Sequence, residues 1–166
     1  MGPRHCHRVR THSRLCKHIL SVYEDDLRNP PIWALPGGYG MNPDCVVLKK
    51  DYVDTEGKVT LYMIYIDHDN LDIILAIRGL NLGKESDILL LLDNKLGQRT
   101  YDGGYVHNGL LKAAQYVLEE ECGVLGELVE KNRECSLTFV EALARGRCGN
   151  AVKNTERLGV YREEED

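Results

Sequence analysis

The chain has 166 residues, of which 43% are hydrophobic and 28% are charged, and its formal net charge at pH 7 is −5. This length and composition are typical of one globular domain with its own core. The sequence has no run of about 18 apolar residues, so it predicts no membrane-spanning helix, and its first residues are too polar for a signal peptide. We therefore expect a cytoplasmic protein, which could still attach to the periphery of a membrane, and the net acidity argues against nucleic acid as a partner.

The two ends of the chain differ in charge from the middle. Five basic residues precede Glu24, the first acidic residue, whereas residues 163–166 are all acidic. Runs of one charge are usually solvated. Residues 1–14 are therefore predicted to be a disordered basic tail, and residues 141–166 a second tail that lacks an apolar pattern. Residues 15–140 form the predicted domain.

The N-terminal part of the chain contains a cluster of side chains of the metal-ligand type. They are His5, Cys6, His7, His12, Cys16 and His18. Their spacing matches none of the usual structural zinc patterns, so a tail without metal is the favoured interpretation and a zinc site the alternative. The six cysteines of the chain have no repeating spacing either, and we predict no disulfide framework in a reducing compartment.

Residues 15–27 predict a short amphipathic helix, because apolar side chains recur there at helical spacing. These side chains are Leu15, Ile19, Val22 and Tyr23. Residues 29–44 contain four prolines and several glycines, which break the backbone into turns. We expect an irregular but packed loop in this part of the chain.

Two strand-like runs follow, at residues 59–67 and 72–79. The turn-forming residues between them predict a β-hairpin. Both runs are apolar at nearly every position, which is typical of strands covered on both faces by helices. Asp67, His68 and Asp69 have side chains that can bind metal, but they lie where the hairpin needs its turn.

A long helix is predicted in the second half of the chain, after an irregular region at residues 81–106. Apolar residues recur there every three or four positions. They are Leu110, Leu111, Ala114, Val117, Leu118, Cys122, Leu125, Leu128 and Val129. Residues 136–140 then predict a short buried strand.

Three sequence motifs together resemble the class 3 lipase family. They are DIILAIRGLNL at residues 72–82, GGYVHNGLLKAA at residues 103–114 and SLTFV at residues 136–140. The chain is most similar to plant mono- and diacylglycerol lipases with an N-terminal region, for which YEDDL, PGGYG and KESD also match, and the resemblance covers residues 15–140. It implies a partial α/β-hydrolase fold, the N-terminal half, with a mixed sheet and flanking helices.

The resemblance also implies roles for individual residues. In that family Arg78 and Gly79 would end the strand that leads into the oxyanion loop, and the backbone N–H of Leu80 would be one oxyanion donor. Such a donor stabilises the negative charge that acyl transfer builds on a carbonyl oxygen. His107 and Gly109 match a motif at the start of the helix before the nucleophile strand, so the resemblance makes His107 structural rather than catalytic.

The nucleophile elbow of the family is absent from the sequence. A G-x-S-x-G motif would follow residues 136–140, but EALARGRCG follows Val140, and none of the four serines has the flanking glycines. Loss of the nucleophile of a triad hydrolase lowers the rate on the order of a millionfold. We therefore expect a lipase fragment, truncated before the elbow, with little or no activity by itself.

Three functions follow as hypotheses. The first is an inactive fragment of an acylglycerol lipase, which belongs to lipid metabolism by descent, needs no cofactor and has acylglycerol or a membrane surface as its partner. The second is a non-catalytic module that binds lipid, a membrane or an intact lipase, and the third is a metal-binding protein. Because the strand at residues 136–140 would be central in the complete enzyme, its far edge should be open to a protein partner.

Overall fold

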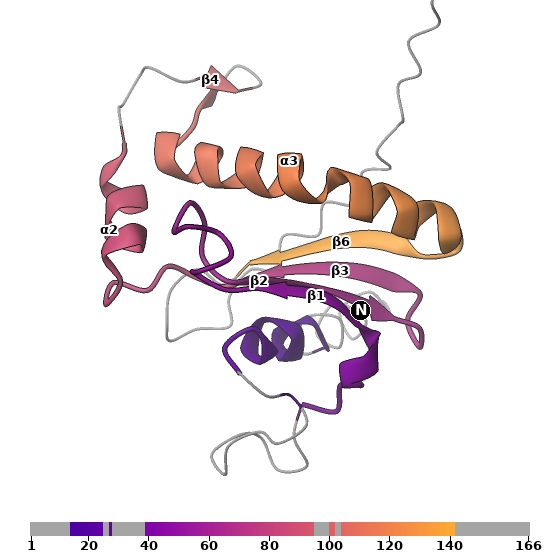
Figure 1. Ribbon diagram of the computed structural model, residues 1–166. Helices are drawn as coiled ribbons and strands as arrows, with labels where there is room; N and C mark the ends of the chain where they lie inside the picture. Colours follow the sequence, from indigo (N-terminus) through magenta and orange to yellow (C-terminus); the bar gives the residue numbers. More distant parts are fainter. Residues whose placement is uncertain (1–13, 25–26, 28–38, 95–99, 102–103, 142–166) are drawn as a thin grey trace, which may run out of the picture.

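The computed structural model describes residues 14–24, 27, 39–94, 100–101 and 104–141 (Figure 1). We call the helix over residues 14–21 the first helix. The other elements, in chain order, are η1 (Pro43–Cys45), β1 (Val46–Lys50), β2 (Tyr62–Asp67), β3 (Asp72–Ile77), α2 (Glu85–Leu92), β4 (Thr100–Tyr101), β5 (Gly104–Tyr105), α3 (Asn108–Lys131) and β6 (Ser136–Glu141). None of the helices in the described ranges is long and apolar enough to cross a membrane.

A mixed sheet of four strands, in the order β1-β2-β3-β6, forms the middle layer. The first three strands pair in antiparallel fashion, whereas β3 and β6 are parallel. A parallel pair needs a crossover connection, and α3 supplies it on one face of the sheet while the first helix covers the other face (Figure 1). The described residues therefore have an α/β arrangement with three layers.

The predicted hairpin is confirmed as β2 and β3. Asp67 pairs with Asp72 next to the turn, and Tyr62 pairs with Ile77 at the other end. Nearly every residue of both strands is buried, which agrees with the prediction that helices cover both faces. The predicted strand at residues 136–140 is confirmed as β6, but the prediction that it is buried is wrong for most of it: Thr138 and Val140 are buried and Phe139 is exposed, because β6 is an edge strand of the described sheet.

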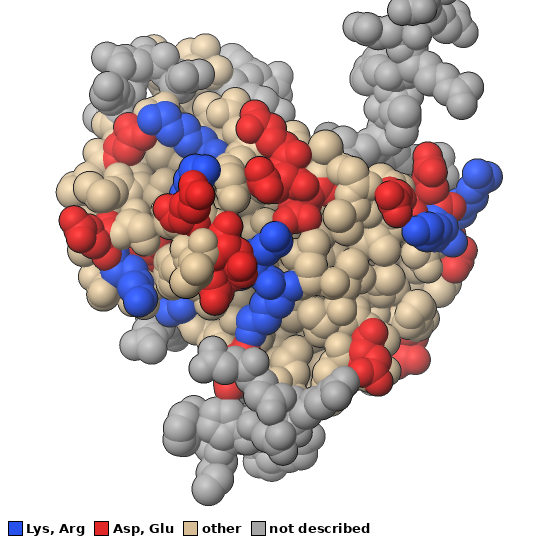
Figure 2. Space-filling view, in the orientation of Figure 1, with Lys and Arg blue, Asp and Glu red and all other residues tan. Residues whose placement is uncertain are grey.

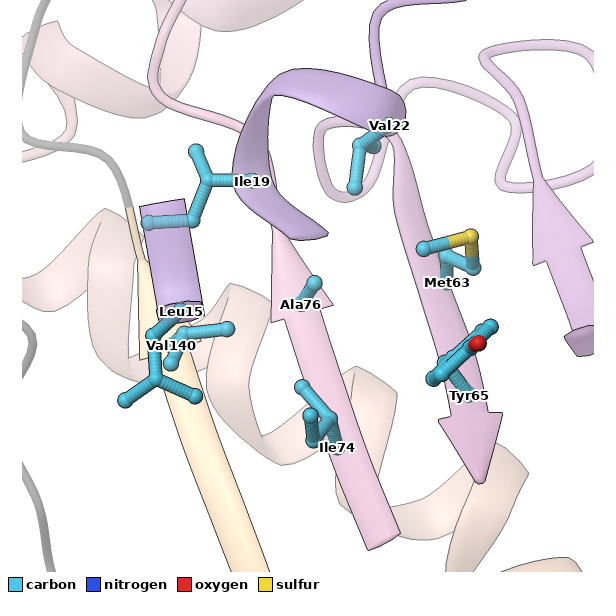
Figure 3. Packing of buried hydrophobic residues seen from close by; sticks show 8 residues of the cluster. All are labelled: Leu15, Ile19, Val22, Met63, Tyr65, Ile74, Ala76 and Val140. Carbon is cyan, nitrogen blue, oxygen red and sulfur yellow. The ribbon is translucent and has the colours of Figure 1, made fainter. Parts of the chain in front are cut away.

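Side chains of the sheet alternate between two apolar clusters. The cluster around the first helix, shown in Figure 3, consists of Leu15, Ile19, Val22, Met63, Tyr65, Ile74, Ala76 and Val140. The cluster around α3 consists of Val59, Tyr62, Ile64, Ile73, Leu75, Ala113, Val117 and Leu125. Because successive side chains of a strand point to opposite faces, β2 and β3 contribute side chains to both clusters. The two strands are therefore apolar almost throughout.

The sequence did not predict β1 or α2. The latter lies within residues 81–106, so the prediction of an irregular region is wrong there. Its sequence, ESDILLLL, has apolar residues in succession rather than at helical spacing, and Asp87 is the one residue of this helix that is buried. Contacts with the rest of the fold therefore determine where α2 lies. The first helix ends at residue 21, before the predicted end at residue 27.

The predicted long helix is confirmed as α3, but its buried face differs from the predicted stripe. Leu118 is 56% exposed, and Val129 and Cys122 are exposed as well. The buried side chains on this face include those of Ala113, Val117, Glu121 and Leu125. The Glu121 carboxylate accepts a hydrogen bond of 2.6 Å from the Tyr62 hydroxyl. Because a carboxylate lies on the buried face, the pattern of apolar residues alone could not predict which face of α3 is buried.

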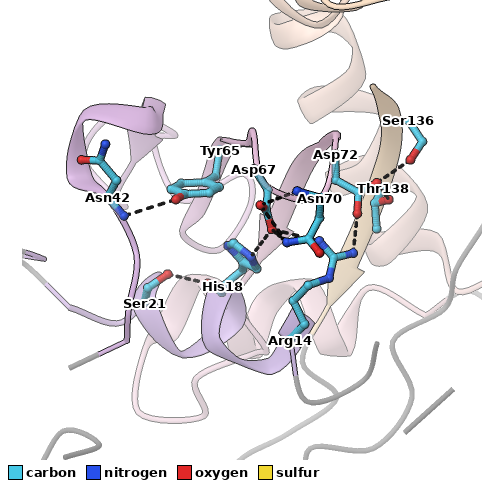
Figure 4. Close-up of polar contacts among 10 residues, drawn as sticks. All are labelled: Arg14, His18, Ser21, Asn42, Tyr65, Asp67, Asn70, Asp72, Ser136 and Thr138. Atoms are coloured by element: carbon cyan, nitrogen blue, oxygen red, sulfur yellow. Dashed lines mark hydrogen bonds and ion pairs between the residues drawn. The ribbon is translucent and has the colours of Figure 1, made fainter. Parts of the chain in front are cut away.

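A polar network attaches the first helix to the turn end of the sheet (Figure 4). Arg14, which the sequence analysis placed last in the basic tail, forms ion pairs with Asp67, at 2.9 Å, and with Asp72. The other carboxylate oxygen of Asp72 accepts hydrogen bonds from the hydroxyl groups of Ser136 and Thr138. One carboxylate thus connects the first helix, β3 and β6.

His18 is completely buried in the same region. Its ring centroid lies 4.9 Å from that of Tyr65, and neither of its nitrogens has a hydrogen-bond partner among the described residues. Burial, followed by the positive charge of Lys17, lowers the pKa of His18 from 6.5 to about 4, although Asp67 acts in the opposite direction. His18 is therefore neutral in the folded protein at pH 7.

We expect His18 to make the fold less stable as the pH falls from 6.5 to 4. In this window the unfolded chain binds a proton at His18 that the folded chain does not bind, so acid favours unfolding, whereas above the window both states are neutral. The full effect is about 3 kcal/mol, at about 1.4 kcal/mol per pKa unit.

Urea unfolding of the wild type and of His18→Leu, at about pH 7.5 and about pH 5, measures this effect. The variant should lose less stability on acidification than the wild type. Equal losses in the two proteins would contradict the assignment of the effect to His18.

Candidate functional site at the carboxyl end of β3

The carboxyl ends of β3 and β6 lie at the same edge of the sheet because the two strands are parallel. β3 ends at Ile77 and is followed by Arg78, Gly79 and Leu80, and β6 ends at Glu141. Gly79 is buried and Leu80 is half-buried. Ligands of open α/β sheets bind outside the carboxyl ends of the strands, so the predicted oxyanion residues lie where a binding site is expected.

A cavity of about 80 Å³ lies at this edge, among the sheet, α2 and α3. It is lined by Val59, Thr60, Ile77, Arg78, Leu80, Leu90, Leu110, Ala113, Ala114, Val117 and Glu141. All but three of these residues are apolar. An engineered apolar cavity of about 150 Å³ holds benzene, so this smaller one has room for a short alkyl group.

The backbone N–H of Leu80 is a candidate donor at the cavity wall. It donates to no acceptor within the part of the chain that the structure describes, whereas two nearby N–H groups, those of Arg78 and Asn81, are bonded. The N–H of Arg78 donates to the backbone carbonyl of Leu61 at 2.8 Å, and the N–H of Asn81 donates to the Asp87 carboxylate at 2.7 Å. A donor fixed in this way, next to an apolar cavity, can bind a carbonyl oxygen.

Asp87 of α2 holds the loop that follows β3. Its carboxylate is completely buried and accepts hydrogen bonds from the Tyr52 hydroxyl at 2.8 Å and from the N–H of Asn81. Burial, together with this hydrogen bond, raises the pKa of Tyr52. The sequence analysis missed both side chains. The sequence indicated Asp87 only by its position, directly before the apolar run of ESDILLLL.

Arg78 is held by aromatic rings rather than by an ion pair with any described residue. Its guanidinium carbon lies 4.4 Å from the ring centroid of Tyr23 and 6.0 Å from that of Tyr52, which is the range of cation–π contacts. Its Nε is buried and has no hydrogen-bond partner among the described residues. The Arg78 guanidinium supplies positive charge beside the cavity.

His107 occupies the N-cap position of α3. Its Nδ1 accepts a hydrogen bond from the N–H of Leu110 at 3.3 Å, and its Nε2 lies 3.0 Å from the carbonyl oxygen of Leu91. One neutral tautomer satisfies both contacts, with Nε2–H as a donor to α2. The ring therefore connects the two helices and is not directed at the Leu80 amide.

Gly109 lies where α3 approaches α2 most closely. Its N–H donates to the backbone carbonyl of Asp93 at 2.8 Å. A Cβ atom at this position would lie 2.0 Å from the carbonyl oxygen of Leu90, a distance that no side chain can adopt without moving one helix. Leu90 itself lines the cavity, so the absence of a side chain at Gly109 helps to set the cavity's shape.

The described serines lack the partner that a triad nucleophile needs. The Ser21 hydroxyl donates to the backbone carbonyl of His18 at 2.7 Å, whereas the hydroxyl groups of Ser86 and Ser136 contact carboxylates. None of these three donates to a histidine nitrogen within the described ranges. Ser13 lies outside the described residues.

The proposed metal ligands are not gathered in the described part of the chain. Four of the six candidates lie outside it, namely His5, Cys6, His7 and His12. Cys16 is disulfide-bonded, so the prediction of no disulfide is wrong at this position, and His18 is buried and neutral. No group of three or more residues of metal-ligand type that could hold an ion occurs among the described residues.

Charged side chains of both signs are mixed on the face shown in Figure 2. Lysine and arginine side chains are interspersed with aspartate and glutamate, and no broad basic area appears there. This face therefore lacks the positive patch that is typical of proteins that bind nucleic acid.

No family model, curated protein or solved structure matches this chain. The resemblance to class 3 lipases therefore depends on the sequence motifs, among them LAIRGLNL and YVHNGLL.

Gly109→Ala is expected to destabilise the fold by more than about 2 kcal/mol, because the new methyl group would overlap the backbone of α2. Gly123→Ala is the matched control, since a Cβ atom there would meet nothing within 4 Å. A helical glycine to alanine change in open space should stabilise by about 0.5–1 kcal/mol. Thermal or urea unfolding measures both effects, and a neutral Gly109→Ala would show that the two helices are not in close contact.

Proposed function

We propose that this chain is part of a class 3 lipase-type protein with an α/β-hydrolase fold, and that the cavity at the carboxyl end of β3 binds the acyl part of an acylglycerol. The observation that carries the proposal is the position of the Leu80 N–H. This N–H follows the end of a parallel strand and lacks an acceptor among the described residues, and Leu80 is one of the residues that line the apolar cavity.

The site's chemistry fits an ester with a short or partly inserted acyl chain. Apolar walls from Leu90, Leu110 and Ala114 would contact the chain, because burial of alkyl groups is favourable by about 0.8 kcal/mol for each CH₂. The Leu80 N–H would then donate to the ester carbonyl. Arg78 adds a fixed positive charge beside the cavity, which favours the same polarisation of the carbonyl.

The proposal assigns binding, not turnover, to the sequence in hand. It contains no G-x-S-x-G motif, and the described serines are not bonded to a histidine. One oxyanion donor without a nucleophile and a base leaves the ester intact. The role of these residues is therefore to hold an acyl ester or to complete a site together with other groups.

Exposed leucines near the cavity support a lipid surface as the source of the ligand. Leu82, Leu89 and Leu92, on α2 and the loop before it, are 65%, 59% and 73% exposed. Large exposed apolar groups that lie close together mark contact sites more often than isolated ones do. The same leucines favour the alternative of a non-catalytic module that attaches to a membrane.

Binding of 1-monobutyrin to the ¹⁵N-labelled chain tests the acyl site. We expect saturable shifts of the Leu80, Leu90 and Ala114 amide signals. Ala114→Trp should weaken binding at least about tenfold because the indole fills the cavity, at about 1.4 kcal/mol per factor of ten. Glu120→Trp, on an exposed part of the same helix outside the cavity, should leave it unchanged. Equal effects of the two variants would place the ligand elsewhere.

The absence of a nucleophile is tested with a serine-directed fluorophosphonate, read by intact mass, and with hydrolysis of a short-chain ester. We expect neither a stoichiometric adduct nor turnover above background. A single labelled serine together with turnover would contradict the assignment of binding alone, and the labelled peptide would identify the nucleophile.

A further inference from the structure

β1 and β6 are the edge strands of the four-stranded sheet in the described part of the chain. β1 has features that discourage pairing with another chain, namely Lys49, Lys50 and a shift of register between Val46 and Leu48. β6 has the sequence SLTFVE, is charged at its last residue alone, and pairs with β3 without irregularity. Of the two edges, β6 is the one suited to further pairing.

An aromatic side chain is exposed beside this edge. Phe139 is 37% exposed although it lies in the middle of β6. Leu137 packs against the α3 cluster, and side chains two residues apart on a strand share a face. Phe139 therefore lies on the α3 side of the sheet.

α3 has an apolar flank above the same edge. Leu111, Leu118, Cys122 and Val129 are separated by seven, four and seven positions, which places them within about 40° of one another around the helix. Tyr116, on the other side of α3, lies beneath Lys58 of the β1–β2 loop, with 5.2 Å between the Lys58 Nζ and the ring centroid. The apolar flank consequently points away from β1 and toward β6.

We propose that β6 pairs with β6 of a second copy of this chain, in antiparallel fashion about a two-fold axis perpendicular to the sheet. In the register that pairs Phe139 with Phe139 of the second copy, opposite side chains lie on one face with Cβ atoms about 4.5–5.5 Å apart. The two rings shield each other, and the apolar flanks of both α3 helices border them. In a two-fold arrangement, the same surface of each copy contacts that surface of the other copy.

The size of the edge agrees with a dimer. β6 is about 20 Å long, and three layers span about 30 Å, so each copy presents about 600 Å². The total of about 1,200 Å² is the lower limit of stable interfaces. Residues 142–166, which follow β6 in sequence, lack apolar residues at regular spacing.

The mass of the full chain in solution tests the proposal. Light scattering at about 10–100 µM should give twice the chain mass of 18.8 kDa. Phe139→Lys should give the single-chain mass, because it places a charge in the paired edge. Val47→Lys, at an exposed position of β1, is the matched control and should remain dimeric. Circular dichroism establishes that each variant is folded.

Cysteine cross-linking keeps the test independent of the stability of Phe139→Lys. Under oxidation, Phe139→Cys should form a dimer linked through that position, identified by peptide mass, whereas Val47→Cys should not. A wild type with the single-chain mass at about 100 µM would overturn the proposal. Loss of the dimer in both lysine variants, or cross-linking of both cysteine variants, would also overturn it.

Discussion

The enclosure of β3 is the constraint on which the rest of this structure depends. β3 pairs with β2 on one side and with β6 on the other, and nearly all of its side chains are buried on both faces. A strand in this position needs every backbone group paired and both faces covered. The first helix and α3 meet the second need, and Asp72 connects the start of β3 to Arg14 and to β6.

At the other end of β3 the same enclosure produces the candidate site. The parallel pairing with β6 requires α3 to return across the sheet, and this path places the start of α3 beside the loop after β3. The buried carboxylate of Asp87 holds that loop, and the close approach of Gly109 to Leu90 joins α3 to α2. Leu80 lines the apolar cavity, and its N–H has no acceptor among the described residues. Binding of an acyl ester is a function that such a geometry can support without a nucleophile.

The two edges of the sheet have different physical characters, and this difference bears on association. Lysines and irregular register discourage β1 from pairing with another chain, whereas β6 pairs in regular register, has a charged side chain at its last residue alone and has an exposed aromatic ring. Edge strands without such protection are covered by another element or pair with another chain. The apolar flank of α3 extends the same surface, so the helix layer and the sheet layer both favour a partner at β6.

The elements that the sequence alone determined are those with a strong local pattern. The long helix α3 follows from apolar residues at every three or four positions, whereas the hairpin of β2 and β3 and the strand β6 follow from short apolar runs. The apolar pattern predicted a strand through Gly79, two residues beyond the observed end of β3 at Ile77. The place of His107 at the start of α3 was implied by the resemblance to class 3 lipases, and the structure has it as the N-cap residue of that helix.

Only the tertiary structure decided the rest, because the deciding contacts join residues that are far apart in the chain. α2 has no apolar stripe, and its place depends on the bonds of Asp87 and on the missing side chain of Gly109. Which face of α3 is buried depends on Glu121, because Tyr62 of β2 donates a hydrogen bond to this buried carboxylate. Arg14, at the end of a basic segment, is held by Asp67 and Asp72 of the hairpin. A buried charge is stable only beside its partner, and no local pattern in the sequence reveals where that partner will be.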